Sequence, residues 1–287
     1  DHYCEKIKKA ALNAIVQVLE SNPSPETIDY EFVTGLNETF LEKLEDEGGG
    51  GIVTLLHTFG GVQLFDILEI VGYAYPEKLQ GEHAFNFRNC SISVEQAKGL
   101  RRVLCIQGLN VRTVDLSDNR LGHEGAEALA PAIRDSASLT SINLSDNNLT
   151  DNGRNMTGIR AIASAIRTSP PVTCLDVRDN GISGDGASQL SAAVLRNLKM
   201  EKFNEIPIKD MRTNASTKLD LSGKEVGVVG CMVVAGLLPV MASLTSIDLS
   251  HNYFGPEGAE ALAPAIAFNP SMTECTLRGN ELGVEGW

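Results

Sequence analysis

The side chains most able to do chemistry in this chain are five histidines, six cysteines and 37 aspartates and glutamates. No two of the histidines stand at the spacing of a metal-binding pair or beside a nucleophile; they are His2, His57, His83, His123 and His251. The cysteines form no C-x-x-C pair. We therefore expect no catalytic residues and no metal site, and we expect that the chain is not an enzyme.

Two glycine-containing stretches are similar to phosphate-binding loops but lack their defining residues. The stretch EGGGGIV at Glu47–Val53 has no following Lys-Ser or Lys-Thr. In SGKEV at Ser222–Val226, a glutamate stands where the serine or threonine should be. Neither stretch predicts a nucleotide site, and we expect no cofactor.

The charge of the chain is uneven and argues against two classes of partner. The net charge is −13, and residues 1–80 hold 14 acidic and 5 basic side chains, which leaves a net −4 for residues 81–287. Phosphate backbones and anionic lipids are bound by clustered Lys and Arg. We expect no nucleic-acid partner and no direct insertion into a membrane.

The strongest pattern is an internal repeat. The decapeptide EGAEALAPAI occurs at Glu124–Ile133 and again at Glu257–Ile266, and hexapeptides such as VDLSDN precede it. The third residues of seven such hexapeptides are separated by 29, 28, 33, 44, 28 and 28 residues; they are Phe87, Leu116, Leu144, Val177, Leu221, Leu249 and Leu277. A period of about 28 residues indicates a stack of similar units.

Each unit combines a strand-like half with a helix-like half. In SLTSINLSDNNL, at Ser138–Leu149, the apolar residues alternate as in a strand, and Asn147 is expected at a turn. The decapeptide has apolar residues at helical spacing, although Pro131 and Pro264 should kink or end their helices. Parallel strands joined by wider helices should form a curved stack with the strands on its inner face.

This sequence pattern resembles that of leucine-rich-repeat proteins of the ribonuclease-inhibitor type. The pattern L-x-x-L-x-L-x-x-N/C-x-L, followed by G-x-x-G-A-x-x-L-A-x-A-L/I, covers roughly residues 84–287. The resemblance implies an α/β fold, a curved solenoid with parallel strands on the concave side and helices on the convex side. Lys224 departs from the asparagine position and should weaken its turn.

We expect two domains. Residues 1–80 lack the repeat and show helical periodicity, which predicts a small all-α domain that caps the open end of the array. Residues 81–287 should form the leucine-rich-repeat domain, with seven clear units and one irregular unit near 198–215. In the irregular unit, a distorted strand should point Phe203, Ile206 and Ile208 inward.

Polar residues between the paired apolar positions should form a column on the concave side. The column reads Asn86, Asp115, Asn143, Asp176, Asp220, Asp248 and Thr276. One interpretation is an acidic seam that receives a basic protein surface; the other is that each aspartate bonds its own turn. Because Arg and Tyr often dominate interface energy, we add Arg178, Arg278 and Tyr253 to the candidates.

The stretch LGVEGW at Leu282–Trp287 matches LGHEGA at Leu121–Ala126, the start of a helix. An array that stops there exposes an apolar edge. Trp287 itself, a continuation of the chain, or another protein should cover that edge, and we favour the last two. Trp287 is therefore a further candidate contact.

These observations predict a non-catalytic interaction or scaffold protein, such as a peripheral subunit of a larger assembly. It would bind a protein partner through the concave face or the C-terminal edge. The alternative is a regulator of a small GTPase, because the family that the chain resembles includes GTPase activators. The cysteines, interpreted as reduced core thiols, favour the cytoplasm or another reducing compartment, while association with an organelle or the cytoskeleton stays open.

Overall fold

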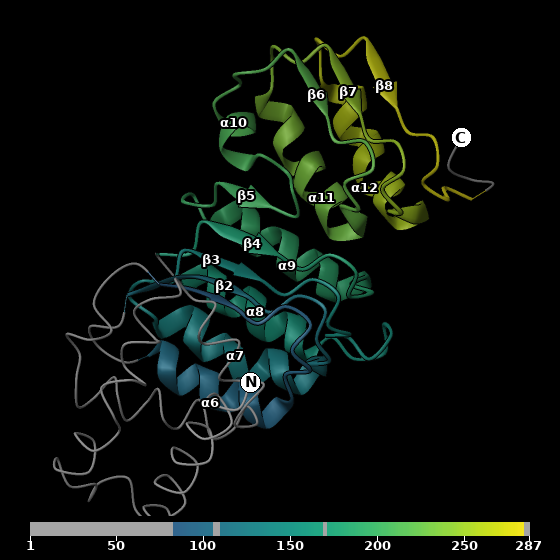
Figure 1. Cartoon of the computed structure of the whole chain (residues 1–287). Coiled ribbons are helices and arrows are strands. Elements are labelled where there is room, and N and C mark those ends of the chain that lie inside the picture. Colours follow the sequence, from purple (N-terminus) through teal and green to yellow (C-terminus); the bar gives the residue numbers. More distant parts are fainter. Residues whose placement is uncertain (1–82, 106–109, 169–170, 284–287) are drawn as a thin grey trace, which may run out of the picture.

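The computed structural model describes residues 83–105, 110–168 and 171–283 (Figure 1). Eight strands lie within these ranges: β1 His83–Asn86, β2 Val111–Asp115, β3 Ser141–Asn143, β4 Cys174–Asp176, β5 Lys202–Phe203, β6 Lys218–Asp220, β7 Ser246–Asp248 and β8 Glu274–Thr276. The helices that alternate with them are α6 Val94–Leu104, α7 Gly122–Asp135, α8 Thr157–Thr168, α9 Gly184–Arg196, α10 Ile208–Arg212, α11 Gly227–Leu237 with the short 3-10 turn Leu238–Val240, and α12 Gly255–Phe268.

The strands pair in parallel and in chain order, but they form two sheets. The first runs β1-β2-β3-β4-β5 and the second runs β6-β7-β8. Successive helices pack against one another, and α9 packs against α11 across the break between the sheets. Strands form one layer and helices the other (Figure 1), which is the α/β solenoid that the repeat predicts.

The apolar positions of the repeat form the core. In the third unit, Leu139, Ile142, Leu144 and Leu149 are fully or almost fully buried. Burying one such side chain stabilises the fold by about 1.5–3 kcal/mol, so each unit contributes several kcal/mol before entropy is counted. The prediction that these residues point to one side is confirmed.

The decapeptide forms the middle of α7 and of α12, as its helical spacing predicts. In α7 its apolar face is buried, including Ala132 and Ile133, because α8 packs on it. In α12 only Gly258 and Leu262 are buried, and Ala263 is exposed. The same ten residues therefore fold alike and differ only in what covers them.

The sequence predicts that proline kinks or ends these helices, and the prolines do not end them. Helix α7 continues four residues past Pro131, to Asp135, and α12 continues four residues past Pro264, to Phe268. Each proline removes only the hydrogen bond to the carbonyl four residues earlier. That carbonyl belongs to an exposed glutamate, Glu127 in α7 and Glu260 in α12, so water can solvate it.

A buried asparagine joins each regular turn to the turn before it. The side chain of Asn252 accepts hydrogen bonds from the N–H groups of Lys224 and Val226, at 3.0 and 3.3 Å. Its amide donates to three carbonyls, including Leu221 O of the preceding unit. Asn119 and Asn180 bind in the same way. These side chains fix the spacing of the units.

The irregular unit has a two-residue strand and a one-turn helix. Phe203, Ile206 and Ile208 are fully buried, as predicted. The guanidinium of Arg212 donates to four carbonyls at the end of α9 and just after it, at 3.0–3.3 Å. The repeat pattern did not single out Arg212, which ties this unit to the one before.

Several predictions lie outside the described residues: the helices of residues 1–80, Cys4 and Trp287. Among the other cysteines, Cys231 is buried and Cys90, Cys174 and Cys275 are half-buried. Cys105 is exposed, so the prediction that the cysteines are core thiols is wrong for this residue. It follows directly after the last residue of α6, at the surface.

Candidate functional site

The predicted polar column exists, and it is interrupted once. Strand register places Asn86 opposite Asp115, Asp115 opposite Asn143, and Asn143 opposite Asp176. In the second sheet, Asp220 lies opposite Asp248, and Asp248 opposite Thr276. Between Asp176 and Asp220 no strand pairing continues the column, because β5 and β6 do not pair.

Six members of the column bind their own turn. In each, a side-chain oxygen accepts a hydrogen bond from the backbone N–H two residues later, at 2.8–3.1 Å. The acceptor and donor pairs are Asn86 and Arg88, Asp115 and Ser117, Asn143 and Ser145, Asp176 and Arg178, Asp220 and Ser222, and Asp248 and Ser250. The turn interpretation therefore accounts for one oxygen of each side chain, and partner binding stays a prediction.

Hydrogen bonds also stabilise the charged form of Asp220. The hydroxyl and the N–H of Ser222 lower the pKa of Asp220, because both bonds favour the carboxylate. The register of β6 and β7 places Asp220 directly beside Asp248.

Arg178 and Asp176 form an ion pair in which two guanidinium nitrogens contact the carboxylate. Nη2 of Arg178 lies 2.7 Å from Oδ2 of Asp176, and Nε contacts both carboxylate oxygens at 3.0 Å. Hydrogen bonding to Asp176 raises the pKa of Arg178. Nη1 reaches across the interruption to the carbonyl of Lys224, at 3.1 Å, so this side chain bridges the two sheets.

A pocket of about 310 Å³ opens at the interruption. Its walls come from the turns that follow β4, β6 and β7. They bring together Arg178 and Tyr253, two predicted contact residues that are 75 positions apart, with Asp179 and Glu225 at the same pocket. Tyr253 is 61% exposed. The other predicted arginine, Arg278, does not line the pocket.

The irregular unit explains the pocket. After β5 the chain passes through Asn204 and Glu205 and enters α10 at Ile208, without a turn like S-D-N-R-L at Ser117–Leu121 of the second unit. The irregular unit therefore leaves a gap in the row of turns that follow the strands. We call the resulting pocket, between the turns 178–183 and 223–229, the notch.

The notch also explains Lys224. An asparagine at this position works by joining its turn to the turn of the preceding unit, and here the preceding unit has none. Lys224 is exposed, while its own N–H is still held by Asn252. The turn at Lys224 therefore forms, and the prediction that Lys224 weakens it stays a prediction.

The acidic residues in and beside the notch differ in the direction in which their pKa is shifted. Burial raises the pKa of Asp179, and the negative charge of Glu225 adds to this effect. Hydrogen bonding to Lys202 lowers the pKa of Glu205. Glu205 lines a smaller hollow of about 180 Å³ beside Asn143 and Asp176 on the strand face.

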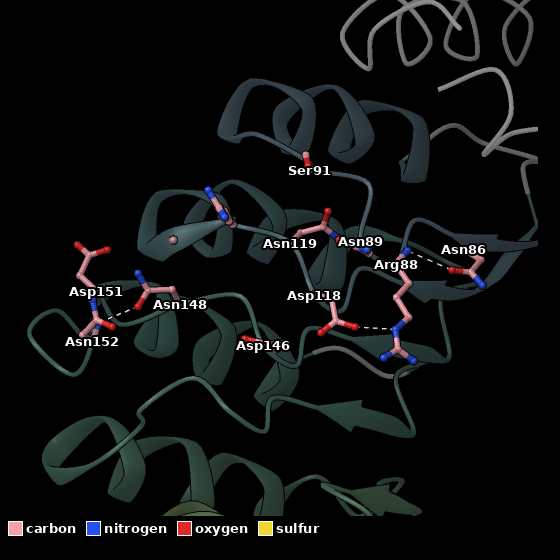
Figure 2. Close-up of a pocket in the computed structure, with 12 residues that line it drawn as sticks. Asn86, Arg88, Asn89, Ser91, Asp118, Asn119, Asp146, Asn148, Asp151 and Asn152 are labelled. Atoms are coloured by element: carbon pink, nitrogen blue, oxygen red, sulfur yellow. Dashed lines mark hydrogen bonds and ion pairs between the residues drawn. The ribbon is translucent and has the colours of Figure 1, made fainter. Parts of the chain in front are cut away.

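A second, wider hollow lies over the turns of the first three units (Figure 2). Its volume is about 1390 Å³, and its lining is dominated by polar side chains. Arg88 pairs with Asp118 at 2.6 Å, and the hydrogen bond that protonated Asp146 donates to Asp118 raises the pKa of Asp146. With an exposed ion pair and no aromatic or aliphatic side chain in its lining, this hollow offers weak anchors.

Neither metal sites nor membrane spans are found in the described ranges. No group of three His, Cys, Asp or Glu side chains there could hold a metal ion. No helix among the same residues is long and apolar enough to cross a membrane. The SGKEV stretch forms the turn between β6 and α11.

Comparison with known proteins identifies the repeat. A family model described as leucine-rich repeat matches residues 109–130, 135–154, 168–191 and 240–263. No curated protein matches. Two similar solved structures are leiomodin-1 actin-binding site 2, at 23% identity over 47% of this chain and 75% of that chain, and the leucine-rich repeat-containing protein LegL7 from Legionella pneumophila, at 14% identity over 83% and 86%. Both have a TM-score of 0.39.

Four matched units and the alternation of parallel strands with helices agree. Proteins of this class present extended surfaces that bind other proteins. The chain is a leucine-rich-repeat protein.

Proposed function

We propose that this protein is a non-catalytic binding protein that holds a protein partner at the notch and the adjoining strand face. One observation carries the proposal: the interruption gathers Arg178 and Tyr253 at one pocket. Tyrosine and arginine are the side chains most often found at the energetic centre of protein interfaces.

The chemistry of the notch suits a protein rather than a small charged ligand. Val226, Val228 and Val229 supply apolar wall, and Arg178, Asp179 and Glu225 supply a polar rim. Since Asp176 already neutralises Arg178, the notch is slightly acidic. This combination of apolar wall and polar rim is typical of an interface core.

The C-terminal edge is the second proposed contact. Helix α12 exposes Phe268, which is 83% accessible, together with the apolar residues that α8 covers in the equivalent α7. A partner that binds there would contact Phe268, and a partner that binds the notch would contact Tyr253.

The experiment is quantitative capture from a native extract with residues 1–287 and three variants as bait, followed by crosslinking mass spectrometry. Tyr253→Ala should reduce a stoichiometric partner at least about tenfold, in line with the loss of an interface anchor. Leu198→Ala is the matched control, because Leu198 is 83% exposed and lies away from the notch.

Phe268→Ala separates the two surfaces. If only Phe268→Ala releases the partner, the C-terminal edge is the contact and the notch is not. Recovery of the bare protein with every bait, under conditions that preserve other complexes, contradicts the proposal.

A further inference from the structure

The backbone N–H groups of the regular turns show which hydrogen-bond donors the notch leaves open. In a regular turn, three backbone N–H groups point toward the next unit. In the third unit, Asp146 N donates to the carbonyl of Arg178, and Asn147 N and Leu149 N both donate to Oδ1 of Asn180, at 3.0 Å each. The turn of the first unit donates to Oδ1 of Asn119 in the same way, and the turn of the sixth unit donates to Oδ1 of Asn252. In the second unit Asp118 N donates to the carbonyl of Ser145, whereas Oδ1 of Asn147 accepts no hydrogen bond from the residues that the structure describes.

The equivalent donors of the fourth unit face the notch. They are the N–H groups of Asp179, Asn180 and Ile182, all three of which line it. None of them donates a hydrogen bond to another residue within the described ranges. The reason is the missing turn of the irregular unit, which would have carried the asparagine. Peptide donors at a protein surface without a protein acceptor bind water, or a polar group of a ligand that displaces the water.

Two neighbouring donors have already recruited oxygens from elsewhere in the chain. Val177 N, whose equivalents bond strand carbonyls, donates to Oδ1 of Asn204 at 2.9 Å. Gly184 N, whose equivalents bond an asparagine carbonyl, donates to a carboxylate oxygen of Glu257 at 2.8 Å. Side-chain oxygens from other parts of the chain can therefore replace the missing main-chain acceptors at this edge of the stack.

The charges around the notch select among oxygen ligands. The carboxylates of Asp179 and Glu225 lie at its rim, and Arg178 is paired with Asp176. A second carboxylate would meet like charge, whereas a carboxamide can accept from the peptide donors and donate its NH₂ group to Asp179 or Glu225. This is the pattern of the internal asparagines, whose oxygen accepts and whose NH₂ group donates.

We propose that the notch recognises an asparagine side chain carried on an exposed loop of the protein partner. This inference rests on the proposed function, and it names the chemistry of the contact. The asparagine of the partner takes the place that the side chains of Asn180 and Asn252 occupy elsewhere in the stack.

The test is an amide-detected NMR titration of the whole chain with N-acetyl-asparagine methylamide. The amide signals of Asn180 and Ile182 should shift saturably, while those of Asn147 and Leu149 should not move. The aspartate analogue should bind at least about tenfold more weakly at neutral pH because of the rim carboxylates. The leucine analogue should produce no shift at these signals.

A blocking variant completes the test. Val228→Trp fills the notch from the start of α11 and should abolish the shifts. Val240→Trp makes the same change at a residue that is 53% exposed and does not line the notch, so it should leave them intact. Unchanged Asn147 and Leu149 signals show that each variant is folded.

Absence of a saturable shift with the asparagine probe, or equal shifts with the leucine or aspartate probe, overturns the inference. These outcomes do not depend on capture of a partner. A positive titration with failed capture would contradict only the proposed function, and successful capture through Tyr253 with a negative titration would contradict only the asparagine.

Discussion

At the residue scale, the buried asparagine is the side chain that links the turn of one unit to the turn of the preceding unit. Asn252 is fully buried, and its side chain makes five hydrogen bonds, all to backbone groups. The sequence pattern identifies the position of this residue. The partners of its side chain follow only from the spacing of neighbouring units.

Asn252→Ala should lower the free energy of unfolding by about 3 kcal/mol, because buried backbone groups lose their partners. Lys224→Asn restores the family pattern but should change stability by less than about 0.5 kcal/mol, since the preceding unit offers no turn to bind. Urea denaturation of the two variants measures both effects. A clear stabilisation by Lys224→Asn would show that the preceding unit does supply partners.

Asp179 should make stability depend on pH. Its pKa is raised in the folded state by burial and by Glu225, so ionisation costs stability as the pH rises from its ordinary value of 3.8 through the folded pKa. At neutral pH this cost is fully present. Asp179→Asn should therefore stabilise the protein at pH 7 by less than about 1 kcal/mol, because solvent screens much of the effect.

The gain should vanish below about pH 3, where the carboxyl group is protonated in both states. Thermal unfolding at pH 7 and pH 3 measures it. A gain of equal size at both pH values would mean that the amide itself, and not the loss of charge, is responsible.

At the element scale, the two copies of the decapeptide have the same secondary structure but differ in how much of their surface is buried. Local sequence predicts a helix in both copies, and both copies are helical. It does not predict exposure, because Ala130 in α7 is buried by the neighbouring helix while Ala263 in α12 is exposed. The prolines do not end their helices for a related reason, since packing along the helix outweighs the loss of one hydrogen bond.

The same substitution in the two copies makes this difference measurable. Ala130→Lys should destabilise the protein by at least about 3 kcal/mol, because it buries a charge without a partner. Ala263→Lys should change the free energy of unfolding by less than about 0.5 kcal/mol. Equal effects in denaturation experiments would contradict the assigned packing of α12.

At the scale of the whole molecule, the solenoid is predictable and its interruption is only partly so. The period, the strand positions and the polar column all follow from the repeat. The 44-residue spacing and Lys224 signal an irregular unit, but they do not show that a turn is missing or that Arg178 and Tyr253 meet there. That meeting depends on how the second sheet is placed against the first.

The central structural claim is that the fourth turn lacks the acceptors that the third turn finds in Arg178 and Asn180. Residue-resolved amide hydrogen exchange tests it directly, because exchange reports hydrogen bonding group by group. Asp179, Asn180 and Ile182 should exchange at least about tenfold faster than Asp146, Asn147 and Leu149 in the third unit. Equal protection of the two turns would show that the fourth turn is already bonded, and the notch would then have no donors to offer.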